Sequence, residues 1–162
     1  MKFRPECNIE YLDNFGRDSL PGHSGFRTVE VRENYLRAEL TITASALNPY
    51  GILHGGSVVT MADTACGYAC IAHLPPGAKG FTTIELKTNF LGSAKDGTVV
   101  CEARAVHIGR STHVWDATVR HKESGRTLAL FRCTQMVLQG EAANAEFDSP
   151  RIGTREQLKV VA

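Results

Sequence analysis

The chain has 162 residues, 43% of them hydrophobic, which suits one domain with a sizeable core of its own. Eighteen Lys and Arg against seventeen Asp and Glu leave a formal net charge of +1, so no strong field favours nucleic acid or an anionic membrane surface. We therefore expect no nucleic-acid or membrane partner. A small molecule or a second copy of the chain is the expected partner.

The N-terminal segment and the cysteines indicate where the chain resides. Residues 1–18 carry charges throughout and lack the apolar stretch of a secretory signal. Five cysteines, an odd number without a CxxC pair, favour reduced thiols over a disulfide framework. Both features predict a cytoplasmic location, and we interpret residues 1–25 as a lead-in segment.

The first regular elements are predicted within residues 27–43, where apolar residues alternate with polar ones at the period of a half-buried strand. Two short strands around a turn at Glu33 and Asn34 are the simplest assignment. Residues 44–56 follow with Asn48-Pro49 and three glycines, a composition typical of a loop.

Residues 57–72 predict a buried helix, because they lack proline, are apolar on nearly every face and exceed the length of an ordinary strand. A membrane span would need about 20 apolar residues, and this run is shorter and contains Asp63.

The second half predicts four strands of about ten residues each, joined by short turns that favour an antiparallel meander: 82–90, 98–107, 112–121 and 127–137. An apolar helix must be wrapped by such a sheet to be soluble, so we expect an α+β domain over residues 1–140. Residues 141–162 are poor in large apolar side chains and are predicted to be a surface-lying or partly disordered tail.

Asp63 is the one ionisable side chain of the predicted helix apart from Cys and Tyr. An isolated carboxylate in apolar surroundings costs several kcal/mol unless it is paired, protonated or open to a ligand cavity. One interpretation is structural, with a hydroxyl donor such as Thr60 or Thr64. The other is functional, with Asp63 as a base or nucleophile.

His54-Gly55-Gly56 stands directly before this helix. Glycines allow a ligand to approach the backbone, and the first N–H groups of a helix have no intrahelical partner. Such donors suit a developing oxyanion. Together with Asp63, about two turns further along, they supply the parts of an acyl-transfer site.

The two features share a spacing that resembles a known signature. Residues 48–56, NPYGILHGG, followed by Asp63 resemble the hotdog thioesterase pattern NxxGxxHGG-x6-D. Residues 82–86 and 109–112 are similar to the PaaI-like, phenylacetate-degradation branch of that family, and the match spans about residues 27–137. The resemblance implies a hotdog fold, in which a long central helix is wrapped by a mainly antiparallel sheet of about six strands.

By this resemblance, the Gly55 N–H binds the thioester oxygen, while His54 and Asn48 shape the pocket beside it. Asp63 acts on the thioester carbon, either as nucleophile or by activating water. Thr83 supplies a hydroxyl that orients the water.

Further residues are implied in substrate binding. Thr82 is an alternative to Thr83 if the alignment slips by one residue. The guanidinium of Arg110 suits the phosphates of coenzyme A. The remaining substrate-binding candidates are Gly56, Thr64 and Ser111. In the family, Asp63 of one subunit faces the HGG loop of the other, which implies a homodimer, often paired again into a tetramer.

The resemblance predicts hydrolysis of an acyl-CoA, with aryl-acetyl or hydroxylated aromatic acyl groups first and medium-chain acyl groups second. No cofactor is expected, since coenzyme A belongs to the substrate. Cys66, Cys70 and His73 lie at helical spacing, but no fourth ligand follows, so we interpret them as packing residues and expect no metal. Two alternatives stay open, a non-catalytic acyl-CoA sensor and a 3-hydroxyacyl thioester dehydratase that uses His54.

Overall fold

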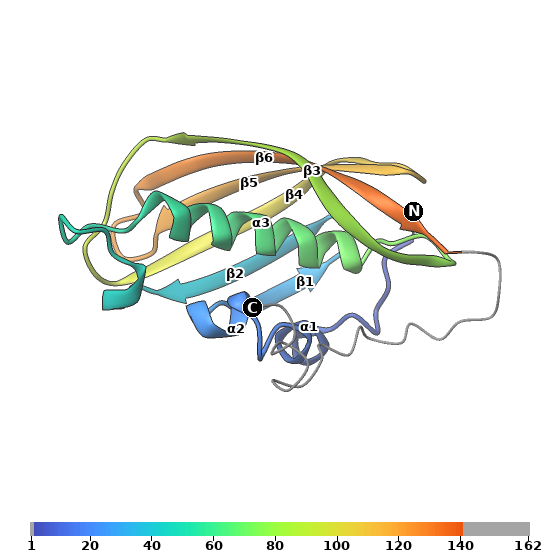
Figure 1. Ribbon diagram of the computed structural model, residues 1–162, viewed down its shortest axis with the longest axis horizontal. Helices are drawn as coiled ribbons and strands as arrows, with labels where there is room; N and C mark the ends of the chain where they lie inside the picture. The colour runs from blue at the N-terminus through green and yellow to red at the C-terminus, as the bar shows by residue number, and fades with distance from the viewer. Residues whose placement is uncertain (1, 141–162) are drawn as a thin grey trace, which may run out of the picture.

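The computed structural model describes residues 2–140, so the predicted tail at 141–162 lies outside the described residues. One long helix, α3 (Gly55–Ile71), lies along one face of a six-stranded sheet, as predicted (Figure 1). The strands are β1 (Arg27–Arg32), β2 (Tyr35–Thr41), β3 (Ala78–Phe90), β4 (Thr98–Ile108), β5 (Thr112–His121) and β6 (Thr127–Gln139). Three short elements complete the fold, namely α1 (Ile9–Phe15), α2 (Leu20–Ser24) and the 3-10 turn η1 (Ala44–Ala46).

The strand order corrects the predicted meander. Every pair is antiparallel, and the order is β1-β2-β4-β5-β6-β3, so β4, β5 and β6 form a meander but β3 pairs with β6 at the far edge. The connection over residues 91–97 therefore crosses from one side of the sheet to the other. This crossing lets the sheet close around α3, and it leaves β3 with a single neighbour within residues 2–140.

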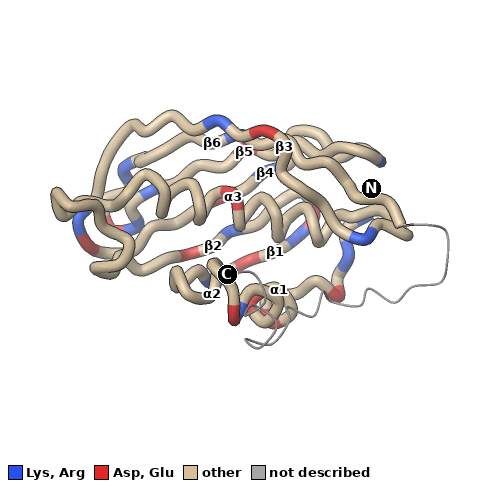
Figure 2. Tube along the Cα trace, in the orientation of Figure 1, with Lys and Arg blue, Asp and Glu red and all other residues tan. Residues whose placement is uncertain are grey.

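Helix α3 begins two residues earlier than predicted. His54 is its N-cap in an extended conformation, and the imidazole Nδ1 accepts a hydrogen bond from the Gly56 N–H at 2.8 Å. Ten of the seventeen residues of α3 are buried. Along its whole length α3 carries one charged position, Asp63, which Figure 2 shows as an acidic segment in an otherwise uncharged helix.

The lead-in segment forms two helices that the sequence pattern did not predict. The side chain of Asn8 accepts a hydrogen bond from the Tyr11 N–H at the start of α1, and the fully buried Leu12 joins the core. Helix α2 packs near α3 and ends at Gly25, whose φ of 82° requires glycine. No helix within residues 2–140 is long and apolar enough to cross a bilayer.

Candidate active site

Asp63 lies half-buried on α3, where it faces the edge strand β3. The Thr83 hydroxyl of β3 donates a hydrogen bond of 3.0 Å to the Asp63 carboxylate. Thr83 is paired in register with the buried Gln135 of β6, whereas Thr82 is exposed. The structure therefore brings Thr83 to Asp63 and not Thr82, and the donor comes from the sheet instead of Thr60 or Thr64 of the helix.

The surroundings of Asp63 change its proton affinity. Burial raises the pKa of the carboxyl above its ordinary value, and the hydrogen bond from Thr83 opposes this effect. A carboxylate with a raised pKa accepts a proton more readily near neutral pH, which is the property that a general base requires.

The N-terminus of α3 presents two further groups. Within residues 2–140, the N–H of Gly55 donates to no backbone carbonyl or side chain, as expected at the first position of a helix. The Gly56 N–H is taken by His54 Nδ1, so the neutral imidazole carries its proton on Nε2. One backbone N–H and one imidazole N–H are thus available at the positive end of the helix dipole.

Phe90, the last residue of β3, contacts this end of the helix, and no local sequence pattern indicates this contact. A Cβ atom added to Gly55 would lie 3.1 Å from Phe90 Cζ, so the aromatic ring rests directly on the glycine. A Cβ added to Gly56 would lie 2.9 Å from His54 Nδ1. Both glycines of the HGG motif are therefore positions where a neighbouring ring occupies the space of a side chain.

Asn48 holds the loop before α3. Its side-chain oxygen accepts hydrogen bonds from the N–H groups of Tyr50 at 2.9 Å and Ile52 at 3.4 Å. Its backbone carbonyl accepts from Gly51, whose φ is 73°. Asn48 thus shapes the turn that delivers His54 to the helix N-terminus.

Arg110 and Ser111 lie at the opposite end of the helix in the same chain. Both occupy the turn before β5, and His113 near the start of that strand contacts Cys70 at 3.2 Å. Because Cys70 follows Gly55 by fifteen residues, this turn is about 20 Å from the HGG motif along α3. Thr64 is half-buried beside Asp63.

The cysteine and histidine spacing on α3 does not form one cluster. Cys66 is fully buried, Cys70 contacts His113, and His73 Nδ1, two residues beyond the end of α3, lies 2.7 Å from the Ala69 carbonyl. Within residues 2–140, no group of three His, Cys, Asp or Glu side chains is arranged to hold a metal ion.

The two halves of the candidate site are far apart in one chain. Asp63 follows Gly55 by eight positions in α3, which corresponds to about 12 Å along the helix axis. A reacting carbonyl must lie within about 3 Å of its oxyanion donor and within similar reach of the base. One small acyl group cannot contact both groups of the same chain.

Known proteins are similar to this chain in sequence. The sequence profile described as the thioesterase superfamily matches residues 50–128. A 1,4-dihydroxy-2-naphthoyl-CoA hydrolase of Listeria monocytogenes is 33% identical over 68% of this chain and 88% of its own length. Acyl-coenzyme A thioesterase PaaI of Escherichia coli is 31% identical over 67% of this chain and 74% of its own length.

The structural comparison confirms the predicted fold. A crystal structure of a mutant of thioesterase PA1618 from Pseudomonas aeruginosa is 27% identical, covers 85% of this chain and 98% of its own, and superposes with a TM-score of 0.80. The hotdog arrangement of one helix against a six-stranded sheet is therefore common to both. The PaaI-like branch stays a prediction, since the relatives also include hydrolases of other names.

Asp63→Asn should raise the melting temperature at neutral pH. Because the folded-state pKa of Asp63 is raised, the folded chain binds more protons than the unfolded chain between the ordinary Asp pKa of about 3.9 and the raised value. The wild type therefore loses stability as pH rises through this window. The uncharged amide of the variant avoids this loss, and its oxygen still accepts the hydrogen bond from the Thr83 hydroxyl. Thermal melts from acidic to neutral pH should show an advantage for the variant that grows and then levels off.

The matched control is Asp116→Asn, which removes a carboxylate that Arg132 binds on the exposed face of the sheet. This variant should gain no stability at neutral pH. A melting temperature of Asp63→Asn at or below that of the wild type would contradict a raised pKa of Asp63.

Proposed function

The chain belongs to the thioesterase superfamily of hotdog-fold hydrolases, and we propose that it hydrolyses acyl-CoA thioesters at a site shared by two copies of the chain. The observation that carries this proposal is the half-buried Asp63 carboxylate of α3, which accepts a hydrogen bond from the Thr83 hydroxyl of β3. The unpaired Gly55 N–H within the described residues supplies the complementary donor.

In the proposed reaction, the thioester oxygen accepts a hydrogen bond from the Gly55 N–H at the start of α3. The N–H of His54 Nε2, at the same end of the helix, is the second proposed donor. As the carbonyl carbon becomes tetrahedral, these groups stabilise the negative charge on oxygen, an effect of about 10²- to 10³-fold in rate for one donor.

Asp63 acts on the other side of the carbonyl. It either removes a proton from water, which then attacks the carbon, or attacks the carbon itself to give an anhydride that water opens. In both routes a C–O bond forms, the C–S bond breaks, and the departing thiolate takes up a proton. Thr83 holds the carboxylate in place and is close enough to orient the water.

The separation of about 12 Å between the two groups in one chain supports the proposal of a second copy. β3 offers a surface for it, because this thirteen-residue strand has an open side within the described residues and carries exposed apolar side chains. Ile84, Leu86 and Phe90 are 55%, 42% and 54% exposed. A twofold axis beside β3 would turn the two α3 helices toward each other, so that Asp63 of one copy meets Gly55 of its partner.

Coenzyme A is the proposed carrier because the named relatives act on CoA thioesters. In the shared site, Arg110 of the copy that supplies Asp63 becomes the candidate for the CoA phosphates. CoA thioesters of aryl-acetyl or medium-chain acyl groups are the proposed substrates. The proposed location of the enzyme is the cytoplasm.

Asp63→Ala should nearly abolish hydrolysis, because removal of a positioned base or nucleophile costs at least about 10²- to 10⁴-fold. Asp63→Asn should lose a similar amount, since the amide keeps the Thr83 contact but not the charge. The measurement is release of free CoA with DTNB across a panel of acyl-CoAs. Turnover like that of the wild type in Asp63→Ala would refute the proposal, and no CoA from the wild type with any substrate would favour a sensor.

Gly55→Pro tests the oxyanion donor alone. Proline suits the first position of a helix and removes only the N–H, and the extended conformation of His54 is the one that a following proline requires. Gly55→Ala is the matched control, since it adds the same Cβ beside Phe90 but keeps the N–H. We expect kcat of the Pro variant to lie about 10²- to 10³-fold below that of the Ala variant. Equal kcat values would exclude the Gly55 N–H from the reaction.

Mixing two inactive variants tests whether the site is shared. If Asp63 and Gly55 come from different copies, a mixed dimer of Asp63→Asn and Gly55→Pro contains one intact site and one doubly altered site. Random exchange of subunits should then restore about a quarter of wild-type activity, as expected for half the dimers with one of two sites intact. Light scattering should report at least a dimer. No recovery after verified exchange would place both groups in one chain.

A further inference from the structure

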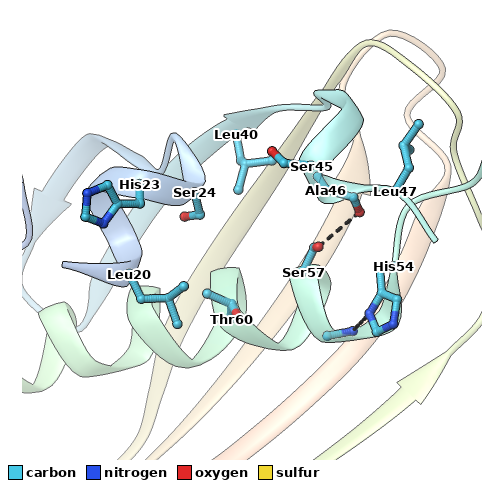
Figure 3. A pocket seen from close by; sticks show the side chains of 11 residues that line it. Leu20, His23, Ser24, Leu40, Ser45, Ala46, Leu47, His54, Ser57 and Thr60 are labelled. Atoms are coloured by element: carbon cyan, nitrogen blue, oxygen red, sulfur yellow. Dashed lines mark hydrogen bonds between the residues drawn. The ribbon is translucent and has the colours of Figure 1, made fainter.

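A cavity of about 450 Å³ lies between α2 and the first turns of α3 (Figure 3). Leu20 of α2 points toward Thr60 of α3, while Ala46 of η1 and Leu40 of β2 lie along the opposite side. At one end the cavity is bounded by His54 and Gly56. Its volume is in the range of pockets that bind small organic molecules.

The lining carries no ionisable side chain apart from the imidazoles of His23 and His54. None of the eleven residues that line the cavity is Lys, Arg, Asp or Glu. The phosphates of coenzyme A would therefore find no Lys or Arg there, although phosphate recognition depends on such groups. The cavity suits an uncharged group.

Three of the four hydroxyl groups in the lining, those of Ser24, Ser45 and Ser57, have partners within the chain, and the fourth belongs to Thr60. Ser24 donates to the Pro21 carbonyl at 2.8 Å, and Ser57 donates to the Ala46 carbonyl at 3.0 Å. Ser45 Oγ lies 3.0 Å from the Thr43 hydroxyl. Since these hydroxyls already have hydrogen bonds, an apolar occupant leaves none of them newly unsatisfied. The walls that remain for contact are the side chains of Leu20, Leu40, Ala46 and Leu47.

The position of the cavity connects it to the reacting end of the helix. His54 and Gly56, which bound the cavity, flank Gly55, the proposed donor to the thioester oxygen. A carbonyl held at Gly55 has its acyl side and its sulfur side directed away from each other. Because the cavity lacks Lys and Arg, the acyl side is the part that it fits, and the CoA side must leave in another direction.

We propose that this cavity holds the acyl group of the substrate, and that α2 sets the length of acyl group that the enzyme accepts; the inference rests on the proposed function. The group is an apolar acyl chain or ring of medium size. Leu20 is the residue through which α2 acts, because it is 63% exposed in the free protein and points into the space that the acyl group would fill. Its burial by substrate would contribute to binding.

The test uses S-alkyl-CoA thioethers of increasing chain length, which have no carbonyl and cannot be hydrolysed, with calorimetry as the measurement. For the wild type, Kd should fall about three- to fourfold for each added methylene until the chain fills the cavity. In Leu20→Trp the larger side chain occupies the cavity, so this dependence on length should be lost while S-methyl-CoA binds as before.

Ile9→Trp is the matched control, because Ile9 is an exposed apolar residue of α1 that does not line the cavity. It should keep the wild-type dependence on chain length. Leu20→Ala, which shortens the wall without filling the space, should reduce the gain per methylene, and circular dichroism melts show that each variant is folded. Long thioethers that bind Leu20→Trp as tightly as the wild type, or a wild type indifferent to chain length, would overturn the inference.

The two proposals fail separately. Binding that depends on chain length without hydrolysis of any acyl-CoA would refute the proposed function and leave the acyl cavity standing. Hydrolysis that is unaffected by Leu20→Trp for every chain length would refute the cavity and leave the hydrolase standing.

Discussion

The burial of α3 is the constraint on which the rest of the structure depends. A helix that is apolar on nearly every face has to be covered, and in this fold β3 crosses to the far edge of the covering sheet beside β6. That crossing brings Thr83 to the one carboxylate of the helix and Phe90 to its first residue. The hydrogen bond to Asp63 and the ring against Gly55 are thus consequences of covering the helix.

Local pattern predicted most elements and indicated Asp63 as the main candidate residue of the site. The apolar run of α3 and the alternation of apolar and polar residues in the strands are local patterns that span a few residues. They can therefore be recognised in the sequence alone. Asp63 stood out because a single charge interrupts an apolar helix. The HGG motif was recognisable because an unpaired helix N-terminus is a property of local backbone.

The features that the sequence did not predict arise from contacts between distant segments. The pairing of β3 with β6 joins Phe81 to Val137, a separation that no local pattern encodes. Helices α1 and α2 are too short to be stable alone and depend on packing through residues such as Leu12. The predicted start of α3 at Ser57 is two residues too late, because glycine has low helix propensity. In the structure the His54 cap compensates for the low propensity of Gly55 and Gly56.

The contact between Phe90 and Gly55 ties two remote positions together. Since the ring occupies the place of a side chain at position 55, what position 55 tolerates depends on the size of residue 90. Changes at two touching residues do not add in free energy. A smaller residue at position 90 would leave room for a side chain at position 55. Substitutions at the two positions are therefore expected to be correlated during evolution. Selection therefore acts jointly on the first residue of α3 and the last residue of β3, although thirty-five positions separate them in the chain.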